Sequence, residues 1–242
     1  HFVNNFFHIQ HPTRGKVKFE PFAYQVRLLH SYHDYRFNIN MMPRQSGKTT
    51  CAAGYLLWYA MFHPDQTVLV AAHKYTGAQE IMQRIRYGYE LCDDYIRAGV
   101  VSYNKGSIEF ENGSRIIASA TSPSAIRGGS FNYILLDEFA FIPDNIAEDF
   151  YSSVYPTIAS GSTTKLVIIS TPNGLNLYYK IWTEATENRS DFKYVDVHWS
   201  DVPGRDEQWR DQQIKNTSEE QFRKEHECEF IGSTNTLINA NK

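Results

Sequence analysis

Hydrophobic positions from Phe37 onward fall into short apolar runs separated by segments of helical periodicity. This alternation predicts an α/β domain with a mostly parallel sheet flanked by helices. We expect strands at the short apolar or alternating runs, which are residues 37–41, 67–72, 132–138, 165–171 and 192–199. We expect helices at the longer periodic segments, which are residues 47–62, 77–92, 146–158 and 174–185.

Three segments carry more specific patterns. Residues 100–120 alternate and contain the turn pairs Lys105-Gly106 and Asn112-Gly113, which favours a β-meander. The run 132–138 is almost entirely apolar until it ends in two acids, as expected of a strand buried on both faces. Residues 192–199 alternate, which is typical of an edge strand.

The last forty residues differ in composition from the rest. Residues 204–230 are charged and helical in pattern, so we assign residues 199–242 to a small helical or linker subdomain. Residues 1–198 form the expected core, and the N-terminal segment could pack with the small subdomain. A chain of 242 residues is long enough for one such core.

Composition narrows the class further. The net charge of −3 argues against a surface that grips nucleic acid everywhere, although it leaves room for a local basic patch. No apolar run reaches the ~18 residues of a membrane helix, so we expect no membrane partner. The three distant cysteines favour free thiols in a reducing compartment. Because the sequence lacks an initiator Met, we expect a fragment of a longer chain.

A phosphate-binding loop is the strongest signal, between the strand 37–41 and the following helix. Gly47 lets the backbone approach phosphates, Lys48 reaches the β- and γ-phosphates, and the Thr49 hydroxyl can ligate Mg²⁺. Met42 replaces the first glycine of the common G-x-x-x-x-G-K-[ST] pattern. Arg44 could touch the γ-phosphate or pair with a neighbouring acid. The predicted nucleotide-binding residues of the loop are Arg44, Gln45, Ser46, Gly47, Lys48, Thr49 and Thr50.

Two acids close the buried strand 132–138. Ligands of parallel sheets sit beyond the carboxyl ends of the strands, so Asp137 and Glu138 should share an edge with the phosphate loop. Asp137 can hold Mg²⁺ and Glu138 can polarise the attacking water. The sequence therefore predicts ATP hydrolysis with ATP and Mg²⁺ as ligands.

Polar residues elsewhere suit supporting roles. Ser170, Thr171 and Pro172 end the next buried strand, where hydroxyls could sense the γ-phosphate or simply cap a helix. Gln25 could bind adenine N6 and N7, with a neighbouring aromatic ring on the base, or be a solvated helix residue. Arg127, on a glycine-flanked loop, could stabilise the transferred phosphoryl group of a neighbouring subunit or make local hydrogen bonds.

The chain resembles the ATPase domain of the large terminase subunit of tailed bacteriophages, of T-even type. The resemblance rests on stretches that run in order along nearly the whole chain, among them YQVRLL, PRQSGKTT, AAHKYTGAQE, NKGSIEFENGS, TSPSAIRGGSF, YILLDEFAFIP, STPNGLNLYYKIW and QFRKEHECEFIGSTNTLI. Such a resemblance implies a RecA-like core of the ASCE P-loop NTPase type.

It also implies a function: powering the packaging of double-stranded viral DNA into a procapsid. The expected partners are DNA, the portal protein, the small terminase subunit and further copies in a ring, thought to be pentameric, in the host bacterial cytoplasm. The family's catalytic residues fall on Arg44, Lys48 and Glu138, and its trans-acting arginine on Arg127. Its magnesium ligands fall on Thr49 and Asp137, its coupling motif on Ser170–Pro172, and its adenine glutamine on Gln25. The family's C-terminal nuclease is absent from this sequence, so we expect no DNA cleavage.

Two other classes share part of this pattern. A RecA-like helicase or translocase has the same loop and acids, but needs a second lobe, and about 50 residues after Phe192 are too few for one. A non-hydrolysing nucleotide switch or assembly module would have no use for a water-polarising Glu138.

Overall fold

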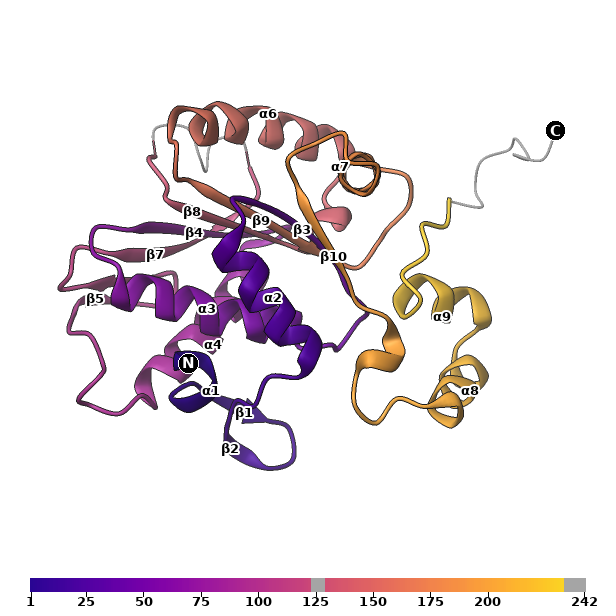
Figure 1. The fold of residues 1–242 in the computed structure, drawn as a ribbon, viewed down its shortest axis with the longest axis horizontal. Coiled ribbons are helices and arrows are strands. Elements are labelled where there is room, and N and C mark those ends of the chain that lie inside the picture. The colour runs from indigo at the N-terminus through magenta and orange to yellow at the C-terminus, as the bar shows by residue number, and fades with distance from the viewer. Residues whose placement is uncertain (123–128, 233–242) are drawn as a thin grey trace.

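The computed structural model of this chain describes residues 1–122 and 129–232. Its centre is an eight-stranded sheet with the strand order β10-β3-β9-β8-β4-β7-β6-β5 (Figure 1). The strands from β10 to β7 pair in parallel, whereas β6 and β5 pair antiparallel. The predicted α/β class with a mostly parallel sheet is therefore confirmed. The eight strands are β3 (Phe37–Met41), β4 (Thr67–Ala72), β5 (Val100–Tyr103), β6 (Ser107–Phe110), β7 (Arg115–Ala120), β8 (Tyr133–Asp137), β9 (Lys165–Ser170) and β10 (Lys193–Asp196).

Helices cover both faces of the sheet. Figure 1 shows one layer on each side, with α6 and α7 over one face and α2, α3 and α4 over the other. The principal helices are α2 (Ala23–Asp34), α3 (Lys48–Phe62), α4 (Tyr75–Glu90), α6 (Asp144–Ser160) and α7 (Leu177–Thr186). Successive strand residues point to opposite faces, so Leu135 joins the α3 side of the core and Leu136 the α6 side. This two-sided burial explains the nearly continuous apolar run of β8.

Most predicted elements recur with small shifts at their ends, each with a local cause. The strand expected at 132–138 ends at Asp137, because Glu138 takes a left-handed conformation. Helix α7 begins only at Leu177, because Gly174 has φ +75° and Asn176 is the N-cap. The segment 192–199 does form an edge strand, but β10 stops at Asp196. The predicted meander is present as β5, β6 and β7.

The N-terminal segment packs on the core. It consists of α1 (Phe2–Asn5) and a hairpin of β1 (His8–His11) and β2 (Gly15–Lys18), and α1 contacts α3 whereas β1 contacts α4. Phe7 is fully buried, and its ring lies against Gly54 and Gly88, where a side chain would collide with it. The N-terminal segment therefore lies on α3 and α4, whereas the sequence left open that it packs with the small subdomain.

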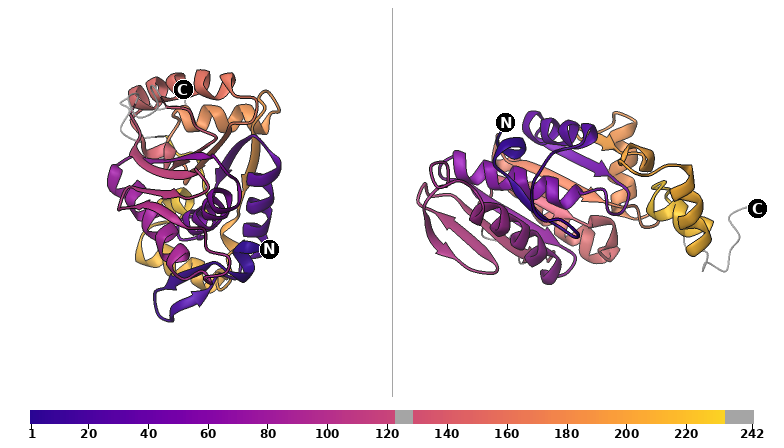
Figure 2. Two further views of the ribbon diagram at one scale, coloured as in Figure 1. Left: turned by 90° about the vertical axis from the view of Figure 1, so that its left-hand side faces the viewer. Right: turned by 90° about the horizontal axis from the view of Figure 1, so that it is seen from below.

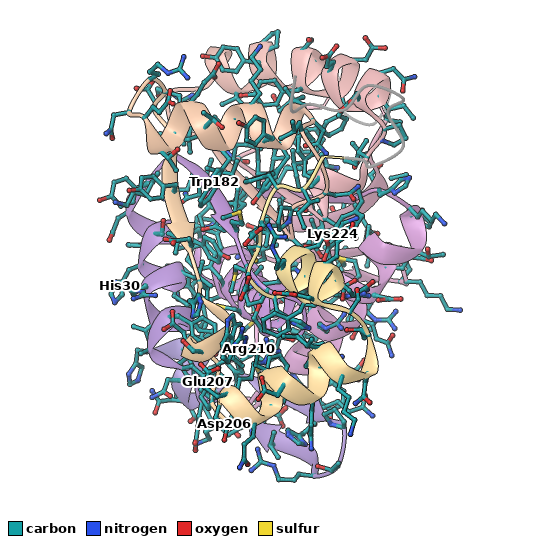
Figure 3. The ribbon with its side chains drawn as sticks, turned by 90° about the vertical axis from the view of Figure 1, so that its right-hand side faces the viewer. His30, Trp182, Asp206, Glu207, Arg210 and Lys224 are labelled. Carbon is teal, nitrogen blue, oxygen red and sulfur yellow. The ribbon has the colours of Figure 1, made fainter. Side chains whose placement is uncertain are left out.

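The tail forms short helices beside the carboxyl ends of the strands (Figures 1 and 2). They are η2 (Trp199–Asp201), α8 (Glu207–Asn216) and α9 (Glu219–Glu225). The Asp206 side chain, labelled in Figure 3, accepts a hydrogen bond from the Trp209 backbone N–H at 2.8 Å and so caps α8. Trp199, Trp209 and Phe222 pack their rings together. Throughout residues 1–122 and 129–232, no helix is long and apolar enough to cross a membrane.

Strand register aligns the chemically important residues at one edge. Asp137 on β8 pairs with Ile169 on β9, and the next residue, Ser170, pairs with Met41 on β3. The chain leaves β3 directly into the phosphate loop. Three strand ends therefore place the loop, the acids and the hydroxyl pair side by side, as expected for the carboxyl edge of a parallel sheet.

Candidate nucleotide-binding site

The phosphate loop is shaped by two left-handed residues. Gly47 has φ +73°, and a Cβ there would lie 2.7 Å from Nε2 of Gln25, so only glycine fits. Gln45 has φ +56°. The buried Ser46 hydroxyl donates to the Pro43 carbonyl at 2.8 Å and closes the loop from inside. Helix α3 begins at Lys48, so its N-terminus, which favours anions, opens onto the loop.

Lys48 connects the loop to the next two strands. Its buried amine lies 3.0 Å from Oε1 of Glu138 and donates to the Thr171 hydroxyl at 3.0 Å. The structure thus brings together three residues that are separated by up to 123 positions. An ammonium group held between a carboxylate and a hydroxyl is well placed to move onto an arriving phosphate oxygen.

Asp137 provides a buried carboxylate beside them. Its Oδ2 accepts from the Thr49 hydroxyl at 3.2 Å, whereas the buried Oδ1 has no hydrogen-bond partner among the described residues. Burial, and then the charge of Glu138, raise the pKa of Asp137 to about 6, against the lowering effects of the Lys48 charge, the Thr49 hydroxyl and the Glu138 backbone N–H. An unpaired buried carboxylate oxygen next to a threonine hydroxyl fits a hard cation such as Mg²⁺.

Thr49, Asp137, Glu138 and Thr171 line a cavity of about 480 Å³. The phosphate loop contributes Arg44 and Thr49, and α4 closes the far side with Glu80 and Arg84. Helix α9 supplies the outer wall through Lys224, which is labelled in Figure 3. The cavity therefore joins the core to the small helical tail. Thr50 points instead into an adjoining hollow that also borders Glu80 and Arg84.

Arg44 is bound to the tail in this structure. Its Nη1 lies 2.9 Å from Oε1 of Glu225, and its backbone N–H donates to the Glu225 carbonyl at 3.0 Å. Arg205 approaches from the same side and donates to the carbonyls of Arg44 and Gln45 at 2.9 and 3.1 Å. The sequence left two roles open for Arg44, a contact with the γ-phosphate or a pair with a neighbouring acid. In this structure Arg44 pairs with an acid, Glu225.

Gln25 lies under the loop. Its Oε1 accepts from the Phe22 backbone N–H at 2.9 Å and its Nε2 donates to the Ser46 carbonyl at 3.2 Å. The Tyr24 hydroxyl donates to the same carbonyl at 2.7 Å. Both side chains are buried, so in this structure they support the phosphate loop from behind, and the adenine role of Gln25 stays a prediction.

The two hydroxyls of the predicted coupling motif face different neighbours. Thr171 contacts Lys48 and, with Pro172, lines the cavity. The Ser170 hydroxyl instead accepts from the Ala140 N–H at 3.1 Å, behind Glu138. Arg127 lies outside the described residues.

Sequence reasoning missed the contributions of the tail and of α7. Glu225 and Arg205 lie 181 and 161 positions from Arg44, and no sequence pattern links them to the loop. Asn176 was detectable only as a polar residue in the STPNGLN stretch, where it caps α7 and also reaches the turn after Glu138.

A match to a protein-family model shows which family this chain belongs to. The model described as the N-terminal part of the T4likevirus-type terminase large subunit matches residues 39–242. The chain belongs to this family. Its matched region begins within β3 and includes the phosphate loop, the acids and the tail helices.

Individual terminases agree with this assignment. The large terminase subunit of Thermus virus P23-45 is 23% identical over 229 residues, which cover 81% of this chain and 46% of that protein. The ATPase domain of the Thermus phage P74-26 large terminase superposes with a TM-score of 0.73 at 21% identity, covering 88% of this chain and 95% of that one. The large terminase of another thermophilic bacteriophage, in complex with ADP, gives 0.69 at 13% identity, covering 87% and 54%.

These similarities confirm the predicted RecA-like terminase fold. The chain spans about half the length of the curated terminases that it matches.

Proposed function

We propose that this terminase chain hydrolyses ATP and that hydrolysis powers movement of double-stranded viral DNA into a procapsid. The observation that carries the proposal is the contact of Lys48 with Glu138 and Thr171, directly beside the buried Asp137. The large terminase of a thermophilic bacteriophage binds ADP on the same fold, which supports a nucleotide as the ligand here.

Asp137 and Thr49 would hold Mg²⁺. The unpaired Oδ1 of Asp137 and the Thr49 hydroxyl would supply hard oxygen ligands. When bound, the ion neutralises negative charge on the phosphate oxygens. Positive charge would also lower the raised pKa of Asp137 and keep it ionised at neutral pH.

When ATP binds, the side chains of Lys48, Glu138 and Arg44 would exchange partners. A phosphate oxygen competes with Glu138 for the Lys48 amine, because both are anionic acceptors. Glu138 is released and is free to orient the attacking water and accept its proton. Arg44 can leave the half-buried Glu225 for the γ-phosphate at little cost, because its own side chain is exposed and ion pairs at the surface are weak.

The remaining site roles are part of the same proposal. Gln45, Ser46, Gly47 and Thr50 would surround the phosphates, and Gln25 would read adenine. Ser170, Thr171 and Pro172 would couple the state of the γ-phosphate to α7. Arg127 would act on the site of a neighbouring subunit. Mixing Arg127→Ala with Glu138→Gln protein tests this, because regained activity requires an arginine supplied between subunits.

The family relationship suggests the biological setting. The proposed partners are double-stranded DNA, the portal protein, the small terminase subunit and further copies of this chain in a ring, pentameric by the resemblance, in the host bacterial cytoplasm. DNA cleavage is not part of the proposal, because none of the proposed site residues serves it.

Phosphate release from Mg·ATP tests the catalytic assignment. We expect Glu138→Gln to bind ATP normally and to lose turnover by about 100-fold or more. Lys48→Ala should weaken ATP binding. Glu148→Gln, an exposed glutamate on α6, is the matched control and should behave as wild type. Near-normal turnover of Glu138→Gln would reject its catalytic role, and unchanged ATP affinity of Lys48→Ala would reject the phosphate loop.

The packaging assignment has a separate test. Portal protein, procapsids or double-stranded DNA should stimulate phosphate release by the wild-type protein and not by Glu138→Gln. A wild-type protein that hydrolyses ATP at one rate with and without all three would count against a packaging motor.

A further inference from the structure

Glu138 adopts a conformation that its own chemistry does not favour. Its backbone angles are φ +52° and ψ +40°, in the left-handed region that non-glycine residues seldom occupy. Such a residue persists only when the surrounding structure fixes it. The short helix η1 (Phe139–Phe141) follows immediately, so the contacts that hold η1 also determine where the Glu138 carboxylate points.

One peptide in η1 is held from both sides. The Ala140 N–H donates to the Ser170 hydroxyl at 3.1 Å. The Ala140 carbonyl accepts from Nδ2 of Asn176 at 2.6 Å and from Nδ2 of Asn173 at 3.3 Å. Ala140 and Ser170 are fully buried, so water does not compete for the bond between them, whereas the two asparagine side chains are half-buried.

Asn176 connects this peptide to the start of α7. While its Nδ2 binds Ala140, its Oδ1 accepts from the Tyr179 backbone N–H at 3.2 Å and caps the helix. The adjacent Tyr178 hydroxyl donates to the Asn40 carbonyl at 3.0 Å, on the strand that leads into the phosphate loop. The turn after Glu138 is therefore tied to the same helix as the phosphate-loop strand.

We infer that Asn176 and Ser170 are positioning residues for Glu138, acting through the Ala140 peptide that both of them hold. The inference rests on the proposed function, in which Glu138 orients the attacking water. Neither residue belongs to the described lining of the ATP cavity, so neither should affect nucleotide binding directly. A displacement of about 1 Å at a catalytic group can cost 100-fold in rate, so loosening this turn should lower turnover.

Asn176→Ser removes the Nδ2 donors, and with them the bond to the Ala140 carbonyl and a second bond to the Asn173 carbonyl at 3.0 Å. Serine is a good N-cap, so it keeps the bond to Tyr179, but its side chain is too short to reach Ala140. Ser170→Ala removes the opposite contact, together with the donation of its hydroxyl to the Thr171 carbonyl at 2.8 Å. For each variant we expect kcat for ATP hydrolysis to fall about tenfold or more while KM for ATP stays unchanged. ATP affinity measured in the Glu138→Gln background should also stay unchanged. Because both residues hold one peptide, the double variant should lose less than the product of the two single effects.

Asn112→Ser is the matched control. Asn112 also braces backbone through its side chain, donating to the Ala60 carbonyl at 2.9 Å and accepting from the Ser114 N–H at 3.0 Å, at the opposite end of the sheet. It should lower the melting temperature without lowering kcat. If Asn176→Ser fails to fold, Asn176→Asp preserves the cap and replaces the donor to Ala140 by a carboxylate oxygen that repels the Ala140 carbonyl, so kcat should fall there too.

The outcomes separate the two claims. Wild-type kcat in Asn176→Ser and Ser170→Ala, with Glu138→Gln inactive, overturns the positioning role alone. A loss that raises KM, or that Asn112→Ser reproduces, overturns it as well. Near-normal turnover of Glu138→Gln overturns the proposed function instead.

Discussion

Asp137→Asn offers a quantitative test of the buried carboxylate. The pKa of Asp137 rises from 3.8 to about 6 in the folded protein, chiefly because burial disfavours the charged form. At ~1.4 kcal/mol per pKa unit, the ionised carboxylate costs the metal-free protein about 3 kcal/mol. Because the folded state holds the proton more tightly, stability falls as pH rises from below 4 through 6, and the cost is complete above that range.

Asparagine carries no charge, so the variant lacks this pH dependence. Asparagine leaves an unpaired amide N–H in place of Oδ1, which has its own cost of roughly 1–3 kcal/mol. That second cost does not change with pH. The decisive quantity is therefore how the difference in unfolding free energy between variant and wild type changes with pH. Relative to wild type, the variant should gain about 1.5 kcal/mol of unfolding free energy between about pH 5 and about pH 8.

Urea unfolding with a metal chelator, at both pH values, measures this quantity. Asp149→Asn, an exposed aspartate on α6, is the control and should track wild type. Adding Mg²⁺ and ADP near pH 8 should stabilise wild type and have a much smaller effect on Asp137→Asn. Equal pH dependence of the variant and wild type would refute a burial-raised pKa at Asp137.

Two further predictions concern the tail and the N-terminal segment. Glu225→Gln frees Arg44 for phosphate, so ATP should bind more tightly. The gain should be no more than about fivefold, because a surface ion pair contributes at most ~1 kcal/mol. Weaker ATP binding in titration calorimetry would contradict this role of Glu225. Phe7→Ala leaves a cavity between α3 and α4, and should cost about 3–5 kcal/mol of unfolding free energy in urea without changing ATP affinity. A loss below ~1 kcal/mol would mean that the N-terminal segment is not part of the core.

The sequence alone determined the layered α/β architecture. The all-apolar run of β8 predicted a strand buried on both faces, and the structure places Leu135 and Leu136 in opposite halves of the core. The phosphate-binding loop could also be predicted from the sequence, because a glycine before Lys48 and Thr49 at a strand–helix junction has few other uses. The carboxyl-edge rule then placed Asp137 and Glu138 beside the loop, where Lys48 does contact Glu138.

Tertiary structure alone decided which side chains meet across long separations. Arg44 pairs with Glu225 because the C-terminal helices fold back to the carboxyl ends of the strands. No hydrophobic pattern in the sequence predicts that the helices fold back there. Gln25 could be placed upstream of the loop from sequence, but only the packing of α2 under the loop commits its amide to Phe22 and Ser46.

The same holds for the turn after Glu138. Short-range patterns fix helices and strands because each depends on neighbours a few residues apart, as the capping of α7 by Asn176 does. The second bond of Asn176, to Ala140, joins the ends of two strands that are adjacent only in the folded sheet. Residue types at these positions are compatible with many partners, and the order and register of the strands select one.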